Sequence, residues 1–237
     1  MSESHAEELE RIKDRYARRI ETGRAALYDP LTPVNTCFRQ ERERAMIDMV
    51  RRLASGRPLS SLKVLEVGCG SGANLVDLIR WGASPEHCIG NELLPDRVAA
   101  ARRVLPGQVT ILDGDAAEMA AADGAFDIIL QSTVFSSILD PSVRDRVAEN
   151  MWRMLAPGGG ILWYDFTVNN PSNPDVTGIK PAEIRRLFPA ATYRFRRVTL
   201  APPLARRLGG ATPMLYTLLN SLPLLRTHVV GLLSKTA

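Results

Sequence analysis

The residues best suited to bind a ligand lie in a glycine-rich segment, Glu66-Val67-Gly68-Cys69-Gly70-Ser71-Gly72, which follows the apolar pair Val64-Leu65. Glycines at alternate positions let the backbone turn tightly and approach a ligand more closely than a Cβ atom permits. Glu92 ends the next apolar segment, 20 residues after Gly72, where a carboxylate can accept hydrogen bonds from ribose hydroxyls. Together these features predict a site for a nucleotide-like ligand.

Two classes of ligand fit these glycines. The pattern Gly68-x-Gly70-x-x-Ala73 matches a relaxed dinucleotide fingerprint, which leaves a nicotinamide enzyme open. Glu66, however, would repel a pyrophosphate and attract a cofactor that carries an ammonium and a sulfonium. Asp113 and Asp115 follow the third apolar segment at the same expected edge. The acidic surroundings favour the cationic cofactor.

The scaffold for these residues follows from the alternation of apolar segments and helical patterns after Leu62. Such alternation is typical of a parallel sheet covered on both faces, so we expect an α/β, doubly wound fold. The expected strands are 63–67, 88–92, 109–112, 126–131, 161–166, 193–200 and 228–233. The expected helices in this part of the chain are 73–81, 95–104, 142–155 and 181–187.

Two further helices are expected ahead of the sheet. Residues 7–20 place Leu9, Ile12 and Tyr16 at helical spacing, and Thr36 is expected to cap a second helix that ends near residue 55. We therefore divide the chain into an N-terminal helical cap, residues 1–58, and a ligand-binding domain, residues 59–237. Within that domain, residues 202–226 form a helical insertion before the last strand.

Five motifs occur in the order found in one enzyme family: the glycine segment, Glu92, Gly114-Asp115-Ala116, Phe126-Asp127-Ile128-Ile129-Leu130 and Leu155-Ala156-Pro157-Gly158-Gly159. Together they resemble the class I S-adenosylmethionine-dependent methyltransferases over roughly residues 62–166, with a weaker fit to residue 233. The resemblance implies a Rossmann-like seven-stranded sheet whose last strand runs antiparallel. It also implies S-adenosylmethionine as the cofactor.

The resemblance assigns roles to individual residues. Gly68, Gly70 and Gly72, with Cys69 between them, would pass the methionine part of the cofactor, and Glu66 would support its amino group. The remaining residues would hold the ribose (Glu92), pack on the adenine (Leu93), meet the adenine edge (Asp115 and Ala116) and lie beside the sulfonium (Gln131 and Ser132). We also expect Tyr28 and Arg39, from the amino-terminal cap, to reach the methionine carboxylate.

Two residues are candidates for the base that a hydroxyl acceptor requires. An antiparallel last strand would begin at the ligand-binding edge, so His228 is the first candidate, since His5 is near the terminus and His87 on the far edge. Asp165, at the end of the fifth strand, is the second. Either side chain could instead bond to nearby backbone. No carboxylate cluster has metal-ligand spacing, so we expect no metal.

The charge is unevenly distributed. The chain carries a net charge of +4, yet residues 184–237 contain nine Lys and Arg and no Asp or Glu. Leucines repeat at helical spacing over residues 202–222. One interpretation is a basic, apolar lid for a lipid-linked or phosphorylated acceptor at a membrane surface; the other is an ordinary leucine core with solvated arginines. Both interpretations stay open at this point.

Composition gives a coarser picture. With 45% hydrophobic and 24% charged residues among 237, the chain is an ordinary globular one. Cys37, Cys69 and Cys88 match no zinc spacing, and the first 25 residues have no apolar core. Neither a signal peptide nor a transmembrane segment is therefore expected, and we predict a cytoplasmic protein.

These observations predict S-adenosylmethionine-dependent methyl transfer to a small molecule or glycan, at a hydroxyl oxygen. The fourth strand ends in Gln131-Ser132-Thr133-Val134 and lacks the Asn-Pro-Pro-Tyr type of motif found in amino-methylating nucleic-acid enzymes, which argues against a nucleic-acid partner. Residues 162–166 and the leucine-rich end resemble methyltransferases that accompany bacterial polysaccharide synthesis. The alternatives are an RNA methyltransferase, a module that binds the cofactor without transfer, and a nicotinamide dehydrogenase.

Overall fold

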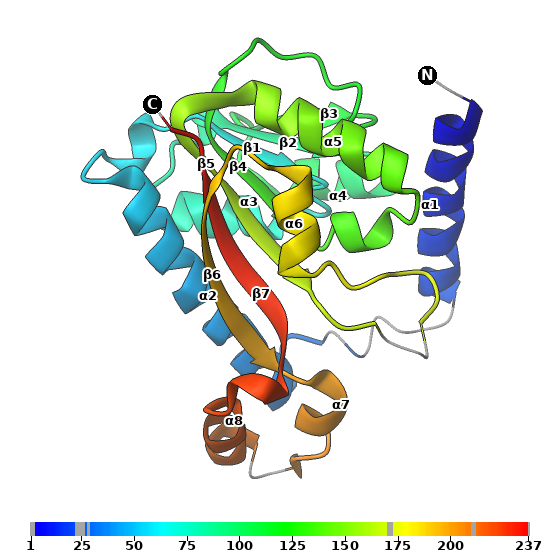
Figure 1. Ribbon diagram of the computed structural model, residues 1–237, viewed down its shortest axis with the longest axis vertical. Helices are drawn as coiled ribbons and strands as arrows, with labels where there is room; N and C mark the ends of the chain where they lie inside the picture. Colours follow the sequence, from blue (N-terminus) through cyan, green and yellow to red (C-terminus); the bar gives the residue numbers. More distant parts are fainter. Residues whose placement is uncertain (1–2, 22–26, 28, 170–172, 210–211, 237) are drawn as a thin grey trace.

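The computed structural model describes residues 3–21, 27, 29–169, 173–209 and 212–236. Within these residues, seven strands form one sheet in the order β3-β2-β1-β4-β5-β7-β6 (Figure 1). The strands are β1 Val64–Val67, β2 Cys88–Glu92, β3 Thr110–Asp113, β4 Phe126–Ser132, β5 Leu155–Phe166, β6 Thr192–Leu200 and β7 Arg226–Ser234.

The sheet is parallel except at β7. The pairs β1–β2, β1–β4, β2–β3 and β4–β5 are parallel, whereas β7 lies antiparallel between β5 and β6. The expected doubly wound fold, with its antiparallel last strand, is therefore confirmed. Because strand order reverses between β1 and β4, the crevice for a ligand lies where these strands end.

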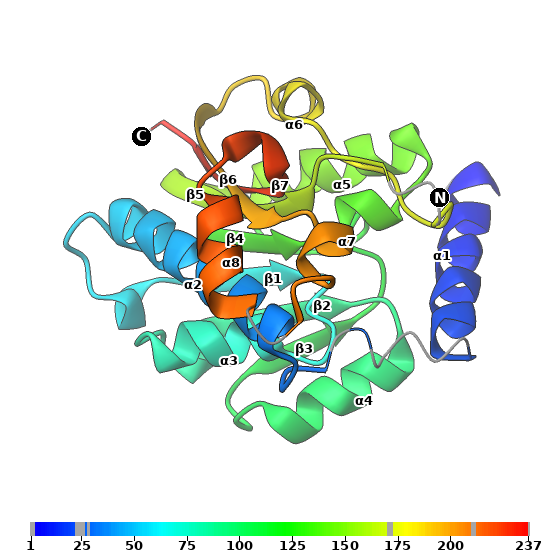
Figure 2. The same cartoon turned by 90° about the horizontal axis from the view of Figure 1, so that it is seen from below.

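Helices cover both faces of the sheet (Figure 2). On one face lie α2 Pro33–Ala54, α3 Ala73–Arg80 and α4 Pro95–Val104; on the other lie α5 Pro141–Met154 and α6 Pro181–Leu187, with α1 Glu3–Glu21 packed against α5. Alternate residues along each strand supply the cores on the two faces of the sheet. Val64, Leu130 and Val230 belong to one hydrophobic cluster, and the residues next to them in sequence, Leu65, Ile129 and Val229, belong to the other.

Most element boundaries agree with the sequence predictions, but the starts of β5 and of the second helix do not. β5 begins at Leu155, six residues before the expected start at residue 161. The prediction that Thr36 caps the second helix is wrong, because α2 begins at Pro33 after Thr32. Proline has the backbone geometry of a first helical turn and lacks the N–H that would stay unpaired there. The Thr36 hydroxyl instead donates to the carbonyl oxygen of Pro30.

The insertion between β6 and β7 forms α7 Pro202–Ala205 and α8 Thr212–Asn220. Ala205 and Tyr216 pack with Val34 and Leu200 in a third hydrophobic cluster, which joins the insertion to α2 and β6. Short 3-10 turns complete the described chain: η2 Leu59–Ser61, η3 Pro85–His87, η4 Phe135–Ser137 and η6 Pro223–Leu225. None of the helices among the described residues is long and apolar enough to cross a membrane.

Candidate cofactor site

A cavity that opens to solvent lies where β1, β2, β3 and β4 end, with about 720 Å³ of space free of protein atoms when the adjoining open solvent is included. Residues from all four strand ends line it, and Leu9, Ile12 and Tyr16 of α1 contribute to the lining as well. Six residues that were predicted to contact the cofactor line this cavity: Gly68, Glu92, Leu93, Asp115, Ala116 and Ser132. The sheet thus brings together residues from four separate segments of the chain.

The glycine loop has the backbone that only glycine adopts easily. Gly68, Gly70 and Gly72 have φ values of 63°, 58° and 85°. A Cβ atom on Gly68 would lie 2.5 Å from Cγ2 of Val134, whereas one on Gly70 would meet nothing closer than 3.9 Å. Gly68 therefore permits close packing against the loop after β4, and the space beside Gly70 is open.

Glu92 organises the backbone around the cavity. Its Oε2 accepts a 2.7 Å hydrogen bond from the Gly70 N–H, and its Oε1 accepts from the N–H groups of Leu93 and Leu94, each at 3.0 Å. The side chain is buried, yet it forms part of the cavity lining. A carboxylate oxygen has two acceptor positions, so Oε2 retains one that a ribose hydroxyl can use.

Glu66 is fully buried on the α2–α3 face of β1 and does not line the cavity. Oε1 accepts a 2.6 Å hydrogen bond from Nδ2 of Asn74, while Oε2 has no partner among the described residues. Burial raises the pKa of this carboxyl to about 8, the bond from Asn74 opposing the shift. An orphaned, buried acid directly under the glycine loop is consistent with a cationic ligand group, so this residue fits the amino group of the expected cofactor.

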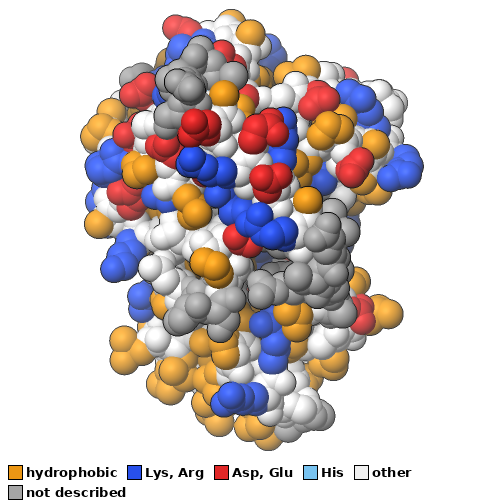
Figure 3. Space-filling model, turned by 90° about the vertical axis from the view of Figure 1, so that its right-hand side faces the viewer, with side chains coloured by type: hydrophobic (Ala, Val, Ile, Leu, Met, Phe, Trp, Pro, Cys, Tyr) orange, Lys and Arg blue, Asp and Glu red, His pale blue; other side chains and the backbone are white. Residues whose placement is uncertain are grey.

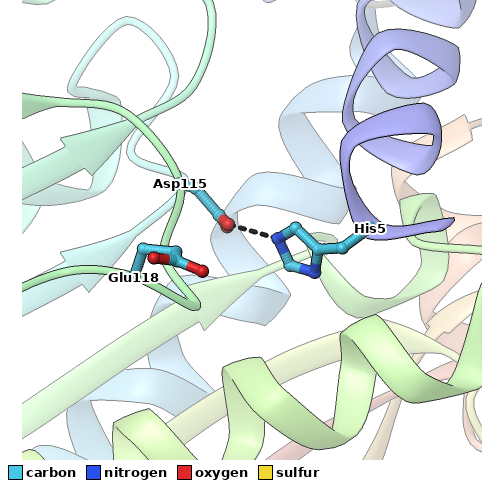
Figure 4. Close-up of side chains that lie close together, drawn as sticks. All are labelled: His5, Asp115 and Glu118. Atoms are coloured by element: carbon cyan, nitrogen blue, oxygen red, sulfur yellow. Dashed lines mark hydrogen bonds and ion pairs between the residues drawn. The ribbon is translucent and has the colours of Figure 1, made fainter. Parts of the chain in front are cut away.

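Asp115 lies at the rim of the cavity, next to the first turns of α1 (Figure 4). Its Oδ2 contacts Nε2 of His5, and its Oδ1 accepts from the Ala117 N–H at 2.9 Å. Glu118 brings a third potential metal ligand within 4.8 Å of these atoms, but its carboxylate also pairs with Arg146 at 2.5 Å. His5 was set aside in the sequence analysis because of its terminal position; only the docking of α1 brings it here.

Helix α1 forms one wall of the cavity through Leu9, Ile12 and Tyr16. The sequence predicted that the amino-terminal helices cover the cofactor, but it named only Tyr28 and Arg39 as contacts. Arg15 and Glu8 form a buried ion pair at 2.7 Å; Arg15 also donates to the Ser137 carbonyl, and Glu8 accepts from the Leu139 N–H. The Arg97 guanidinium lies 4.2 Å from the ring centre of Tyr16. The apolar spacing of this helix indicated a buried face but gave no sign of what that face would contact.

Several predicted cofactor residues lie outside the cavity lining. Gln131 is buried and holds the loop after β4, since it donates to the Tyr164 carbonyl and accepts from the Val134 N–H. The Cys69 thiol faces Gly90 in the core, and Arg39 is exposed on α2 near Asp77. Gly70, Gly72 and Glu66 do not line the cavity either. Tyr28 lies outside the described residues.

The two candidate bases lie on opposite faces of the sheet, and neither lines the cavity. Asp165 is fully buried on the α5 face, where Oδ2 accepts from the Ser136 N–H at 3.1 Å and Oδ1 from the Phe166 N–H at 2.9 Å. Burial raises the pKa of this carboxyl to about 7. The bond from Ser136 holds the turn after β4 in place. In this structure Asp165 therefore positions that turn.

His228 lies on the α2 face, paired in register with Phe166. Its ring stacks on Tyr164 with 5.3 Å between ring centres, and the Arg42 guanidinium lies 5.3 Å from the centre of the same tyrosine ring. Burial and the nearby Arg42 charge lower the pKa of His228 to about 4. The imidazole is therefore neutral at pH 7, as a proton acceptor must be.

A family model described as a methyltransferase domain matches residues 64–159, the segment that contains β1 to β4, the glycine loop and Asp115. Over these residues the chain is similar to a methyltransferase domain. The link to polysaccharide synthesis is not supported by the relatives below.

Curated methyltransferases match about two thirds of this chain. Norajmaline N-methyltransferase of Rauvolfia serpentina is 29% identical over 66% of this chain, and a ubiquinone biosynthesis O-methyltransferase of a Chelativorans species is 30% identical over 66%. The chain spans 54% and 60% of their lengths. In fold, it resembles Burkholderia thailandensis 1,6-didemethyltoxoflavin-N1-methyltransferase, solved with S-adenosylhomocysteine (TM-score 0.64, 16% identity, 100% of this chain and 92% of that one).

Proposed function

We propose that this protein transfers the methyl group of S-adenosylmethionine to a small organic acceptor, at a hydroxyl oxygen. The observation that carries the proposal is the cavity in which Gly68, Glu92, Leu93, Asp115 and Ser132 meet at the strand ends of a methyltransferase domain. S-adenosylmethionine supplies an activated methyl group, and the enzyme contributes mainly alignment of donor and acceptor.

Each part of this cofactor has residues that suit it in or beside the cavity. Glu92 accepts from the ribose hydroxyls, and Leu93 and Ala116 offer apolar surface to the adenine. Asp115 and the backbone around it accept from the adenine amino group. Ser132, at the end of β4, lies beside the reacting sulfonium. The space at Gly70 receives the methionine part, with the Glu66 carboxylate beneath it as a counter-charge for the ammonium.

His228 is the proposed proton acceptor for a hydroxyl substrate. Ser132 in the cavity pairs in register with Tyr164 of the neighbouring strand, and the Tyr164 ring stacks on His228. These three side chains therefore form a row across one face of the sheet, from the cofactor cavity toward β7. Neither Tyr164 nor His228 lines the cavity, so an acceptor would reach the neutral imidazole from the β7 end of this row, with the methyl donor at the other end.

The test is formation of S-adenosylhomocysteine with panels of phenols, sugars, amines and RNA as acceptors. We expect turnover with a hydroxyl acceptor, and at least a hundredfold lower kcat for His228→Gln, which is the range of a lost general base. His87→Gln is the matched control, because His87 lies at the opposite sheet edge and bonds to the Ser60 carbonyl. Turnover only with amines, or equal rates for both variants, would contradict the hydroxyl assignment.

A further inference from the structure

The insertion between β6 and β7 leaves one of its sides uncovered. α8 buries Thr212 and Tyr216, whereas Met214 and Leu218, one helical turn apart, are 71% and 64% exposed. Leu222 and Leu224, directly after α8, are 53% and 89% exposed. Single exposed apolar residues are common, but a group of them beside charged residues marks an interaction surface.

The charge within the insertion itself has one sign. Residues 201–236 contain no Asp or Glu. Arg206 and Arg207 are exposed directly after α7, and neither forms a salt bridge within the part of the chain that the structure describes. Figure 3 shows hydrophobic and basic side chains toward the lower end of the molecule, where α7 and α8 lie, and acidic side chains mostly above. The surface therefore complements an anionic partner.

One acid lies beneath α8, on the buried side of the helix. Glu41 of α2 is buried, and its carboxylate accepts hydrogen bonds from the Thr199 N–H at 2.9 Å, the Tyr216 hydroxyl at 2.5 Å and Nδ2 of Asn220 at 2.7 Å. These bonds anchor α8 to α2 and β6. Because the buried side of α8 is fixed in this way, its exposed side is presented in one orientation.

We propose that Met214, Leu218, Leu222, Leu224, Arg206 and Arg207, together called the α7–α8 surface, dock on an anionic lipid bilayer. The apolar side chains would enter the boundary between headgroups and acyl chains, and the arginines would meet lipid phosphates. A second copy of the chain would bring the same positive charge to the contact. RNA offers phosphates but no apolar phase for these aliphatic side chains.

The experiment is co-sedimentation of the full chain with phosphatidylcholine vesicles and with vesicles that also contain phosphatidylglycerol. Neither cofactor nor acceptor is added, so the result is independent of the proposed methyl transfer. We expect binding to the anionic vesicles, weakened by salt. Leu218→Glu/Leu224→Glu should lower the partition coefficient at least tenfold. Arg206→Gln/Arg207→Gln should lower it about thirtyfold, since one basic residue near an anionic leaflet contributes about fivefold.

Arg103→Gln/Val104→Glu is the matched control, because it alters an exposed arginine and an exposed apolar residue on α4 and should bind as the wild type does. All the altered side chains are exposed, so thermal melting should match the wild type. Absence of binding to anionic vesicles, or equal binding by the surface and control variants, would overturn the proposal. So would a concentration-dependent dimer in light scattering that the Leu218→Glu/Leu224→Glu variant abolishes, or RNA binding tighter than vesicle binding at the same salt.

Discussion

We expect Glu66 to couple cofactor binding to the release of a proton. Its pKa is raised to about 8 by burial, so the free protein holds the carboxyl mostly protonated at pH 7. A neighbouring ammonium would stabilise the carboxylate, and binding of S-adenosylmethionine at pH 7 should therefore release up to roughly 0.9 proton. Calorimetry in buffers of different ionisation enthalpy measures this number. Glu66→Gln should abolish the release, whereas Asp77→Asn on the outer side of α3 should leave it unchanged.

At the scale of single residues, the sequence predicted where the cofactor site lies but not which side chains from the helices contact it. Gly68, Glu92 and Asp115 follow strand ends, and parallel strands end at one edge, so their convergence was predictable. The contact of His5 with Asp115 was not, since it depends on where α1 docks. Arg39 is exposed and does not line the cavity, and its position could not be predicted because helical spacing does not say which face of α2 turns toward the sheet.

At the scale of elements, α1 depends on a buried ion pair for its position over the cavity. Arg15→Met would leave Glu8 buried without its counter-charge, an effect of about 3–5 kcal/mol when a buried pair is broken. We expect faster hydrogen exchange in α1 and around Leu139, together with weaker cofactor binding, while the exchange of β4 and β5 stays slow.

Arg11→Met provides the control on the same helix. Arg11 pairs with Glu7 at 3.0 Å, but both side chains are more than half exposed, and such pairs contribute little. Equal exchange in the two variants would show that the buried pair does not hold α1 in place. The pattern of Leu9, Ile12 and Tyr16 predicted that α1 has a buried face. That these residues line the cavity could not be predicted from the pattern, because it depends on where α1 packs on the folded sheet.

At the scale of the whole molecule, two buried acids make folding pH-dependent. The pKa values of Glu66 and Asp165 are raised to about 8 and about 7, so their contribution to stability is complete below about pH 4 and is lost as the pH rises through these values. His228 has a lowered pKa, about 4, and acts in the opposite direction only below about pH 6.5.

The free energy of unfolding of the cofactor-free protein should therefore fall between pH 6.5 and 8. Each acid contributes a slope of at most about 1.4 kcal/mol per pH unit. Urea denaturation across this range measures the slope, and Glu66→Gln/Asp165→Asn should flatten it. An unchanged slope in the double variant would mean that neither acid is held protonated by the fold.

The central claim is that the cavity at the strand ends binds S-adenosylmethionine through Glu92, and calorimetry tests it most directly. We expect S-adenosylmethionine and S-adenosylhomocysteine to bind and NAD not to bind. Glu92→Gln should weaken cofactor binding at least tenfold, because charge-assisted hydrogen bonds to the ribose are lost. Asp113→Asn, the exposed acid beside Glu92 in the sheet register, should change the affinity less than twofold. Tighter binding of NAD, or equal affinities for the two variants, would contradict the account.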